Sequence, residues 1–230
     1  MSNNDDKKLA ILEKIIASND SIRAVVAKAR TRAEKTVKKL KLSDEKISEK
    51  IAVRHIIAHY ANMCALTGGA SGLPALIPVI GHIYSIFGAS TADALAALKF
   101  EIEMALALSD YMGYDIDDPK ERQIAIGLAC ASLENAAKSK NPLKAKDVVD
   151  YALAEYSTRE LSKTIIKLIS RAIFALTAKR WTRFFPVVGI AIGGTVNKIL
   201  TMHTGRGCYN AIRRRKYHLS EHYSPFSVKD

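Results

Sequence analysis

Two apolar stretches of this chain share a short element, proline–valine–aliphatic–glycine, and their burial decides the fold. The first stretch reads LPALIPVIGHIYSIFGASTADALAAL from Leu73 to Leu98, and the second reads FFPVVGIAIGGTVNKIL from Phe184 to Leu200. Both approach the length that spans a bilayer, but proline and glycine interrupt each of them. We therefore expect two kinked helical segments that pack together at the core of one bundle. Re-entrant insertion into lipid is the alternative, and it would require protein or water partners for the backbone groups that proline frees.

The remainder of the chain carries helical patterns. Its 230 residues include only 12 glycines and 6 prolines, whereas alanine, leucine, isoleucine and lysine dominate, a composition that favours helices. No hairpin dipeptide joins alternating apolar runs, so we expect no sheet. The predicted fold class is all-α, as a single multi-helix bundle. Periodicity and capping residues predict helices over residues 7–18, 20–41, 44–66, 90–112 and 119–138, and further helices from 142 and from 158.

The sharpest helix-start signal is the tetrapeptide Asp118-Pro119-Lys120-Glu121. Aspartate suits the N-cap position and proline suits the first helical position. Glutamate three residues after the cap would complete a capping box. We therefore predict a helix that begins at Pro119.

Cysteine usage and the N-terminus both favour a cytosolic protein. Cys64, Cys130 and Cys208 are widely spaced and odd in number, so we expect reduced thiols rather than a disulfide framework or a zinc site. The opening residues, MSNNDDKKLAILEK, lack the apolar core of a signal peptide. No uninterrupted apolar run reaches the ~18 residues of a simple transmembrane anchor.

The charge of the chain is concentrated at its two ends. The formal net charge is +12, and it divides into +6 for residues 1–60, −5 for residues 61–158 and +11 for residues 159–230. The last segment also holds the second apolar stretch. Basic and apolar residues in combination indicate an anionic partner surface, either a membrane or a nucleic acid.

A basic and aromatic segment follows the second apolar stretch. Arginine beside tyrosine and tryptophan suits the interface of a membrane, and it also suits nucleic acid. The chain has no helix-turn-helix, RNA-recognition or zinc-finger pattern, so nucleic acid is the less favoured partner. The residues that we expect to bind an anionic surface are Arg206, Arg213, Arg214, Arg215 and Lys216.

An enzyme is the alternative in a different class. Asp93 falls within an apolar helical pattern, and a carboxylate in an apolar pocket can act as a general acid or base. His82 could donate to it, so Asp93 and His82 are the weak catalytic candidates of a hydrolase-type site. No serine–histidine–acid order is recognisable, however. Lys99 and Glu103 stand at the i, i+4 spacing of a helical ion pair.

Two histidine pairs have a spacing that can chelate a metal. His55 and His59, like His218 and His222, lie four residues apart and would share a helix face. An apolar residue follows the first histidine of each pair, where a metalloprotease would carry glutamate. We expect no metal and no cofactor, and these four residues are the candidates if a metal does bind.

Several segments recur together in one known family. They are TGGASGLPALIPVIG at 67–81, Asp93, YMGYD at 111–115, DPKER at 118–122, PVVG at 186–189, Gly193, Asn197 and Gly205-Arg206. In this order they resemble the EcsC protein family, over roughly residues 50–219. The resemblance implies a mostly helical bacterial protein whose family name comes from genetic association with an ABC transporter. It implies no defined reaction, so no catalytic residue is carried over.

The resemblance also singles out polar residues in an apolar context. Asp93, Asp115 and Asn197 are the core polar candidates. We expect a basic helical extension at 1–45, an EcsC-like domain at 46–219 and a tail at 220–230.

The function expected from the sequence is that of a non-catalytic accessory protein that binds lipid. It would lie at the cytoplasmic side of the cell membrane and have a possible link to an ABC transporter.

Overall fold

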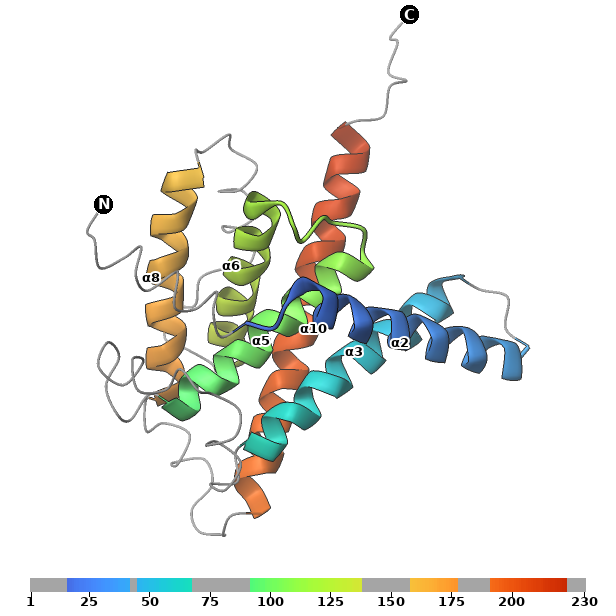
Figure 1. Cartoon of the computed structure of the whole chain (residues 1–230), viewed down its shortest axis with the longest axis horizontal. Coiled ribbons are helices and arrows are strands. Elements are labelled where there is room, and N and C mark those ends of the chain that lie inside the picture. The colour runs from blue at the N-terminus through green and yellow to red at the C-terminus, as the bar shows by residue number, and fades with distance from the viewer. Residues whose placement is uncertain (1–15, 42–44, 68–91, 138–157, 178–190, 223–230) are drawn as a thin grey trace, which may run out of the picture.

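The computed structural model describes residues 16–41, 45–67, 92–137, 158–177 and 191–222, which form six helices and no strand (Figure 1). The all-α prediction is therefore confirmed. Both proline–valine elements lie outside the described residues, as does the helix expected from 142, so the kinked core remains a prediction. The helices are α2 (Asn19–Lys39), α3 (Glu45–Thr67), α5 (Ala92–Tyr111), α6 (Pro119–Ala136), α8 (Thr158–Thr177) and α10 (Ala191–His222).

Helix α5 lies at the centre of the bundle. It contacts all five of the other described helices, and every residue from 100 to 109 is buried. A helix that is buried around its whole circumference needs apolar residues on every face. The sequence of α5 meets this need except at Ser109 and at two glutamates, Glu101 and Glu103, which are 1% and 3% exposed.

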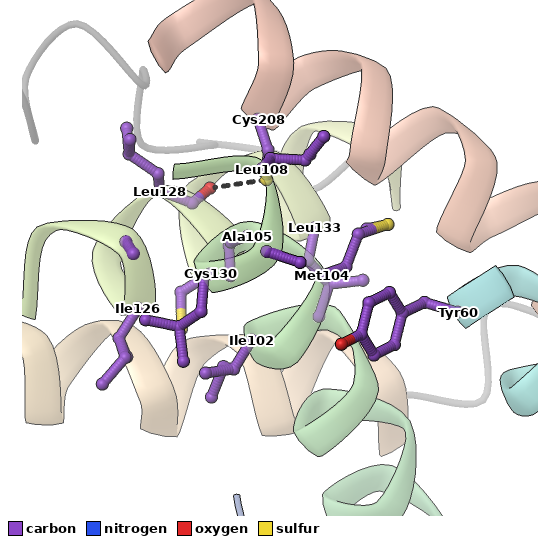
Figure 2. Packing of buried hydrophobic residues seen from close by; sticks show 14 of the residues in the cluster. Tyr60, Ile102, Met104, Ala105, Leu108, Ile126, Leu128, Cys130, Leu133 and Cys208 are labelled. Atoms are coloured by element: carbon purple, nitrogen blue, oxygen red, sulfur yellow. Dashed lines mark hydrogen bonds between the residues drawn. The ribbon is translucent and has the colours of Figure 1, made fainter. Parts of the chain in front are cut away.

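The core is formed where α5, α6 and α10 meet. Figure 2 shows Met104 and Leu108 of α5 beside Leu133 of α6 and Cys208 of α10. Helix α6 is buried continuously from residue 123 to residue 134. Helix α8 covers α6 with an apolar stripe, which includes Ile165, Leu168, Ile169, Ala172 and Ile173.

Helix α2 belongs to the same core. Its buried residues are Ile22, Val26, Ala29 and Ala33, and they pack against α3 and α5. The segment at 1–45 that we expected to be an extension therefore shares its core with the predicted domain, as far as it is described. Ser18 is the N-cap of the helix, and its hydroxyl accepts the backbone N–H of Ser21 at 3.3 Å.

The start of α2 corrects two predictions. The expected helix at 7–18 does not extend through its last three residues, which are not helical. The helix predicted over 20–41 begins one residue earlier, at Asn19. A serine cap at position 18 suits this start, because its hydroxyl can reach a free N–H of the first turn.

The connection from α5 to α6 follows the local sequence closely. Helix α5 ends before Gly113, which adopts a φ of +93°, a conformation that glycine tolerates and other residues rarely adopt. Asp118 then caps α6 by accepting the backbone N–H of Lys120 at 2.8 Å, with Pro119 at the first helical position. Both boundary predictions are confirmed.

Helix α10 extends for 32 residues and packs against α3, α5 and α6. Within its basic segment at 205–217, Cys208, Ala211 and Ile212 are buried. Gly205 permits this approach, since a Cβ atom there would lie 2.8 Å from both Ile57 and Met104. The helix therefore carries an apolar face as well as its basic residues.

The substitution Gly205→Ala tests this close approach. We expect it to lower the free energy of unfolding by about 1–3 kcal/mol, the usual cost of forcing an extra methyl group into a packed core. At a site without this contact, glycine to alanine within a helix raises stability by up to about 1 kcal/mol. Urea denaturation decides the sign, with the exposed neighbour Arg206→Ala as the control. A stabilised Gly205→Ala protein would contradict the packing of α10 on α3.

Candidate functional site

Charged side chains draw attention to two parts of the structure: a pair of buried carboxylates on α5 and the basic surface of α2 and α10. Glu103 forms the predicted i, i+4 ion pair with Lys99, with Nζ and Oε1 2.5 Å apart. The same oxygen accepts the backbone N–H of Ala17 at 2.6 Å. Glu103 therefore ties the segment before α2 to the central helix.

Glu101 forms no ion pair with any cation in the described part of the chain. Its Oε1 accepts a hydrogen bond from the hydroxyl of Thr201 on α10 at 2.7 Å, while its Oε2 has no hydrogen-bond partner among the described residues. Burial disfavours the charged form, and the pKa of this carboxyl rises from 4.5 to about 8, although the Thr201 bond lowers it in part. Glu101 is therefore protonated at neutral pH.

The thiols nearby are unreactive for the same reason. All three cysteines are buried, and none of them forms a disulfide within the described part of the chain. Burial raises the pKa of Cys64, Cys130 and Cys208, for Cys208 to about 12. A protonated thiol is a poor nucleophile. Burial therefore favours the neutral forms of Glu101 and of the thiols of Cys64 and Cys208.

The structure describes only some of the predicted polar candidates. His82 lies outside the described residues, and Asp93 lies in the first turn of α5 without a described side chain. Asn197 is half-buried on α10. Asp115 is wrong as a core candidate: its side chain is 68% exposed in the α5–α6 connection, where it accepts the backbone N–H of Asp117 at 3.0 Å.

The histidine pairs lie on separate helices. His55 and His59 are on α3, and His218 and His222 are at the end of α10, where their side chains are not described. Within the described part of the chain, no three histidine, cysteine or acidic side chains lie close enough together to hold a metal ion.

Arg215 is the clearest departure from the predicted basic surface. It is 7% exposed, and its guanidinium binds Glu121 through two hydrogen bonds of 2.5 and 2.6 Å. It also lies over the ring of Tyr114, 4.4 Å from the centroid. Glu121, expected in a capping box, is engaged by this arginine instead. Arg215 therefore holds α10 against the start of α6 and is not available to an outside partner.

The other predicted basic residues of α10 remain accessible to different degrees. Arg206, Arg214 and Lys216 are exposed, and Arg213 is half-buried. Lys216 donates to the carbonyl of Met112 at 3.0 Å. Arg213 lies over the ring of Tyr217, which is 54% exposed. This end of α10 therefore presents cations together with an aromatic ring.

The strongest basic surface is on α2. Residues 28–41 expose seven lysine and arginine side chains and a single carboxylate, Glu34. Leu40 is 57% exposed at the end of this helix, between the lysines at 39 and 41. We call this the cationic face; its members are Lys28, Arg30, Arg32, Lys35, Lys38, Lys39 and Lys41. The sequence pattern showed these charges, but we had placed the binding residues on α10.

Contacts on another side of α2 fix its orientation. Arg23 binds Asp117 at 2.5 Å and lies 3.7 Å from Asp110, and this arginine together with Asn19 holds the pKa of Asp117 below its usual value. Arg30 donates to the carbonyl of Tyr111 at 3.2 Å. These contacts join α2 to the α5–α6 connection, so the remainder of the cationic face is directed away from the core.

Comparison of the chain with protein-family models, with curated proteins and with solved structures found no match in any of the three. None of the six described helices combines the length and the apolar character that crossing a membrane requires.

The substitution Glu101→Gln tests the protonated carboxyl. The folded wild type keeps a proton that its unfolded chain releases, so its stability declines as the pH rises from about 4.5 to about 8. The glutamine side chain does not titrate, so the stability of the variant lacks this decline with pH. We expect the variant to gain on the order of 4 kcal/mol relative to wild type across that window, since the pKa rises from 4.5 to about 8 and one pKa unit corresponds to about 1.4 kcal/mol. Urea denaturation at both pH values measures the gain.

Glu34→Gln is the control for this experiment, because Glu34 is exposed. Its stability relative to wild type should stay nearly constant over the same range. A constant difference for Glu101→Gln as well would show that Glu101 is charged in the folded protein.

The substitution Arg215→Met tests the buried ion pair. Removing one partner leaves Glu121 without its cation, so we expect a loss of about 3 kcal/mol in the free energy of unfolding. The adjacent Arg214→Met changes an exposed side chain and should stay within about 0.5 kcal/mol of wild type. Thermal and urea denaturation compare the two variants. If the two variants were equally stable, the buried ion pair would be contradicted, and Arg215 would belong to the accessible basic surface.

Proposed function

We propose that this protein binds the anionic surface of a membrane as a peripheral, non-catalytic accessory protein, and that the cationic face of α2 makes the contact. The observation that carries the proposal is the set of seven exposed cations at 28–41 with one carboxylate among them. Each lysine or arginine near an anionic bilayer contributes about 1 kcal/mol of attraction. Several such residues on one rigid helix are sufficient for binding without any lipid-spanning segment.

The tip of α2 adds an apolar contact to this attraction. Leu40, 57% exposed, lies next to Lys38, Lys39 and Lys41. An exposed leucine between lysines can enter the headgroup region while the ammonium groups stay at the phosphates. Exposed Tyr217 beside Arg213 and Arg214 offers a similar combination at the end of α10.

The resemblance to the EcsC family agrees with this proposal. It suggests a bacterial protein at the cytoplasmic side of the cell membrane, with an ABC transporter as a possible partner. The two apolar stretches at 73–98 and 184–200 could add to the contact or could complete the core. The enzyme alternative rests on Asp93 and His82, and it stays a prediction because His82 and the side chain of Asp93 lie outside the described residues.

Co-sedimentation with vesicles tests the proposal. The full-length protein should sediment with vesicles of phosphatidylcholine and phosphatidylglycerol, and it should not sediment with phosphatidylcholine alone. Binding should weaken as salt increases, because ions screen exposed charges. The triple variant Lys35→Gln, Lys38→Gln, Lys39→Gln should bind roughly a hundred-fold more weakly, at about 1 kcal/mol per residue.

The matched control removes three lysines elsewhere, with Lys120→Gln, Lys167→Gln and Lys198→Gln. It has the same net charge as the first variant but an intact cationic face, so its binding should stay close to that of wild type. Equal losses in both variants would mean that net charge alone attracts the protein. Absence of binding to both kinds of vesicle, with tight binding to duplex nucleic acid instead, would overturn the proposal in favour of a nucleic-acid partner.

A further inference from the structure

We propose that Lys28, Arg32 and His59 form a site between α2 and α3 that selects phosphomonoester headgroups at the membrane surface. The inference rests on the proposed function and names the lipid chemistry that the cationic face recognises. It also assigns a role to His59, which we had considered only as a metal ligand.

The first observation is the arrangement of cations on α2. Lys28, Arg32, Lys35 and Lys39 are all exposed, and their spacing of four, three and four residues places them along one stripe of the helix. Glu34, the carboxylate of this region, does not share the stripe. Like charges at i, i+4 repel each other and weaken the helix. An anion bound along the stripe would remove this repulsion.

The second observation is that α3 places His59 near Lys28 and Arg32 of this stripe. Helices α2 and α3 pack against each other, and His59 lies close enough to Lys28 and Arg32 to be affected by both charges. Burial, followed by Lys28 and Arg32, lowers the pKa of His59, while Glu103 of α5 acts in the opposite direction. The ring of the adjacent Tyr60 meets that of His59 edge to face, 5.0 Å between centroids.

Charge complementarity identifies the ligand class. Three cationic or protonatable groups from two helices match a compact anion with more than one charge. A phosphomonoester carries about −1.5 to −2 charges at neutral pH and presents three acceptor oxygens. A phosphodiester headgroup carries one charge and fewer free oxygens. Arg32 can bind two oxygens of such a group at once, and Lys28 supplies a point charge.

His59 makes the site sensitive to pH. Its lowered pKa leaves it neutral at neutral pH when the site is empty. A bound dianion favours the imidazolium form, so binding takes up a proton. The contribution of His59 therefore grows as the pH falls. Glu103 also faces His59, but its carboxylate is already bound by Lys99 and by the N–H of Ala17. We therefore assign the pH dependence of binding to His59.

The experiment compares two anionic lipids on the full-length protein. Vesicles of phosphatidylcholine contain either phosphatidic acid, a phosphomonoester, or phosphatidylglycerol, a phosphodiester, with contents adjusted to equal zeta potential. We expect wild type to prefer phosphatidic acid by about five-fold or more, the ratio that one additional well-placed charge contact would give. The variant Lys28→Gln, Arg32→Gln should lose this preference.

The matched control is Lys38→Gln, Lys41→Gln, which removes two charges of the cationic face away from His59. It should bind both vesicles more weakly and retain the preference for phosphatidic acid. Equal binding of wild type to both lipids, or an unchanged preference in the Lys28 and Arg32 variant, would overturn this inference. The proposed function itself fails only if neither anionic vesicle is bound.

A second variant tests the role of the histidine. On phosphatidic acid vesicles, the ratio of wild-type affinity to that of His59→Asn should be larger at pH 6 than at pH 8. His203→Asn changes an exposed histidine of α10 and should give a ratio near one at both values. A ratio for His59→Asn that does not change with pH would remove His59 from the site.

Soluble phosphate is the other possible source of the same chemistry. Glycerol phosphate should compete only when it is in large excess over the accessible lipid, because it lacks the surrounding anionic surface and the contact of Leu40. Displacement at a concentration equal to that of the accessible phosphatidic acid would show that the ligand is soluble, and the membrane part of the inference would be wrong.

Discussion

The burial of α5 on every side is the constraint on which the rest of the structure depends. Five helices contact it, so each must present an apolar face inward and can keep charged residues only on its outer side. Helix α2 shows the result most clearly: Ile22, Val26, Ala29 and Ala33 face the core, and the basic residues occupy the remaining circumference. The cationic face is thus a consequence of how α5 is covered.

The two glutamates of α5 show two solutions to burying a carboxylate. Glu103 is held by Lys99 and by the N–H of Ala17. Among the described residues, Glu101 has the Thr201 hydroxyl as its hydrogen-bond partner, and burial favours its neutral form. Both solutions join α5 to another segment, α10 in one case and the start of α2 in the other. A perturbed carboxyl at the core of this bundle is therefore explained by packing and does not require a reaction.

Short sequence signals predicted the features that depend on neighbouring residues alone, such as helix boundaries and ion pairs within one helix. Gly113 and Asp118 mark helix ends correctly, and the Lys99–Glu103 pair follows from helical spacing alone. Contacts between distant residues were not predictable in this way. Arg215 meets Glu121 across 94 residues, so its burial could not be read from the basic run that contains it. The same holds for His59 beside Lys28 and Arg32, because periodicity places residues on a helix face without saying which helix packs there.

Contacts between distant residues distinguish the two basic helices, α2 and α10, which look alike in sequence. On α10, burial of Cys208, Ala211 and Ile212 draws Arg215 into the core, and its guanidinium becomes part of the packing. On α2, Arg23 and Arg30 serve as anchors to the α5–α6 connection, and the remaining cations stay exposed. An anionic surface can attract only charges that the protein has not already neutralised. Net charge at the two ends of the chain therefore overstates the contribution of α10, and the anchored geometry of α2 makes its cations the ones that a membrane would meet.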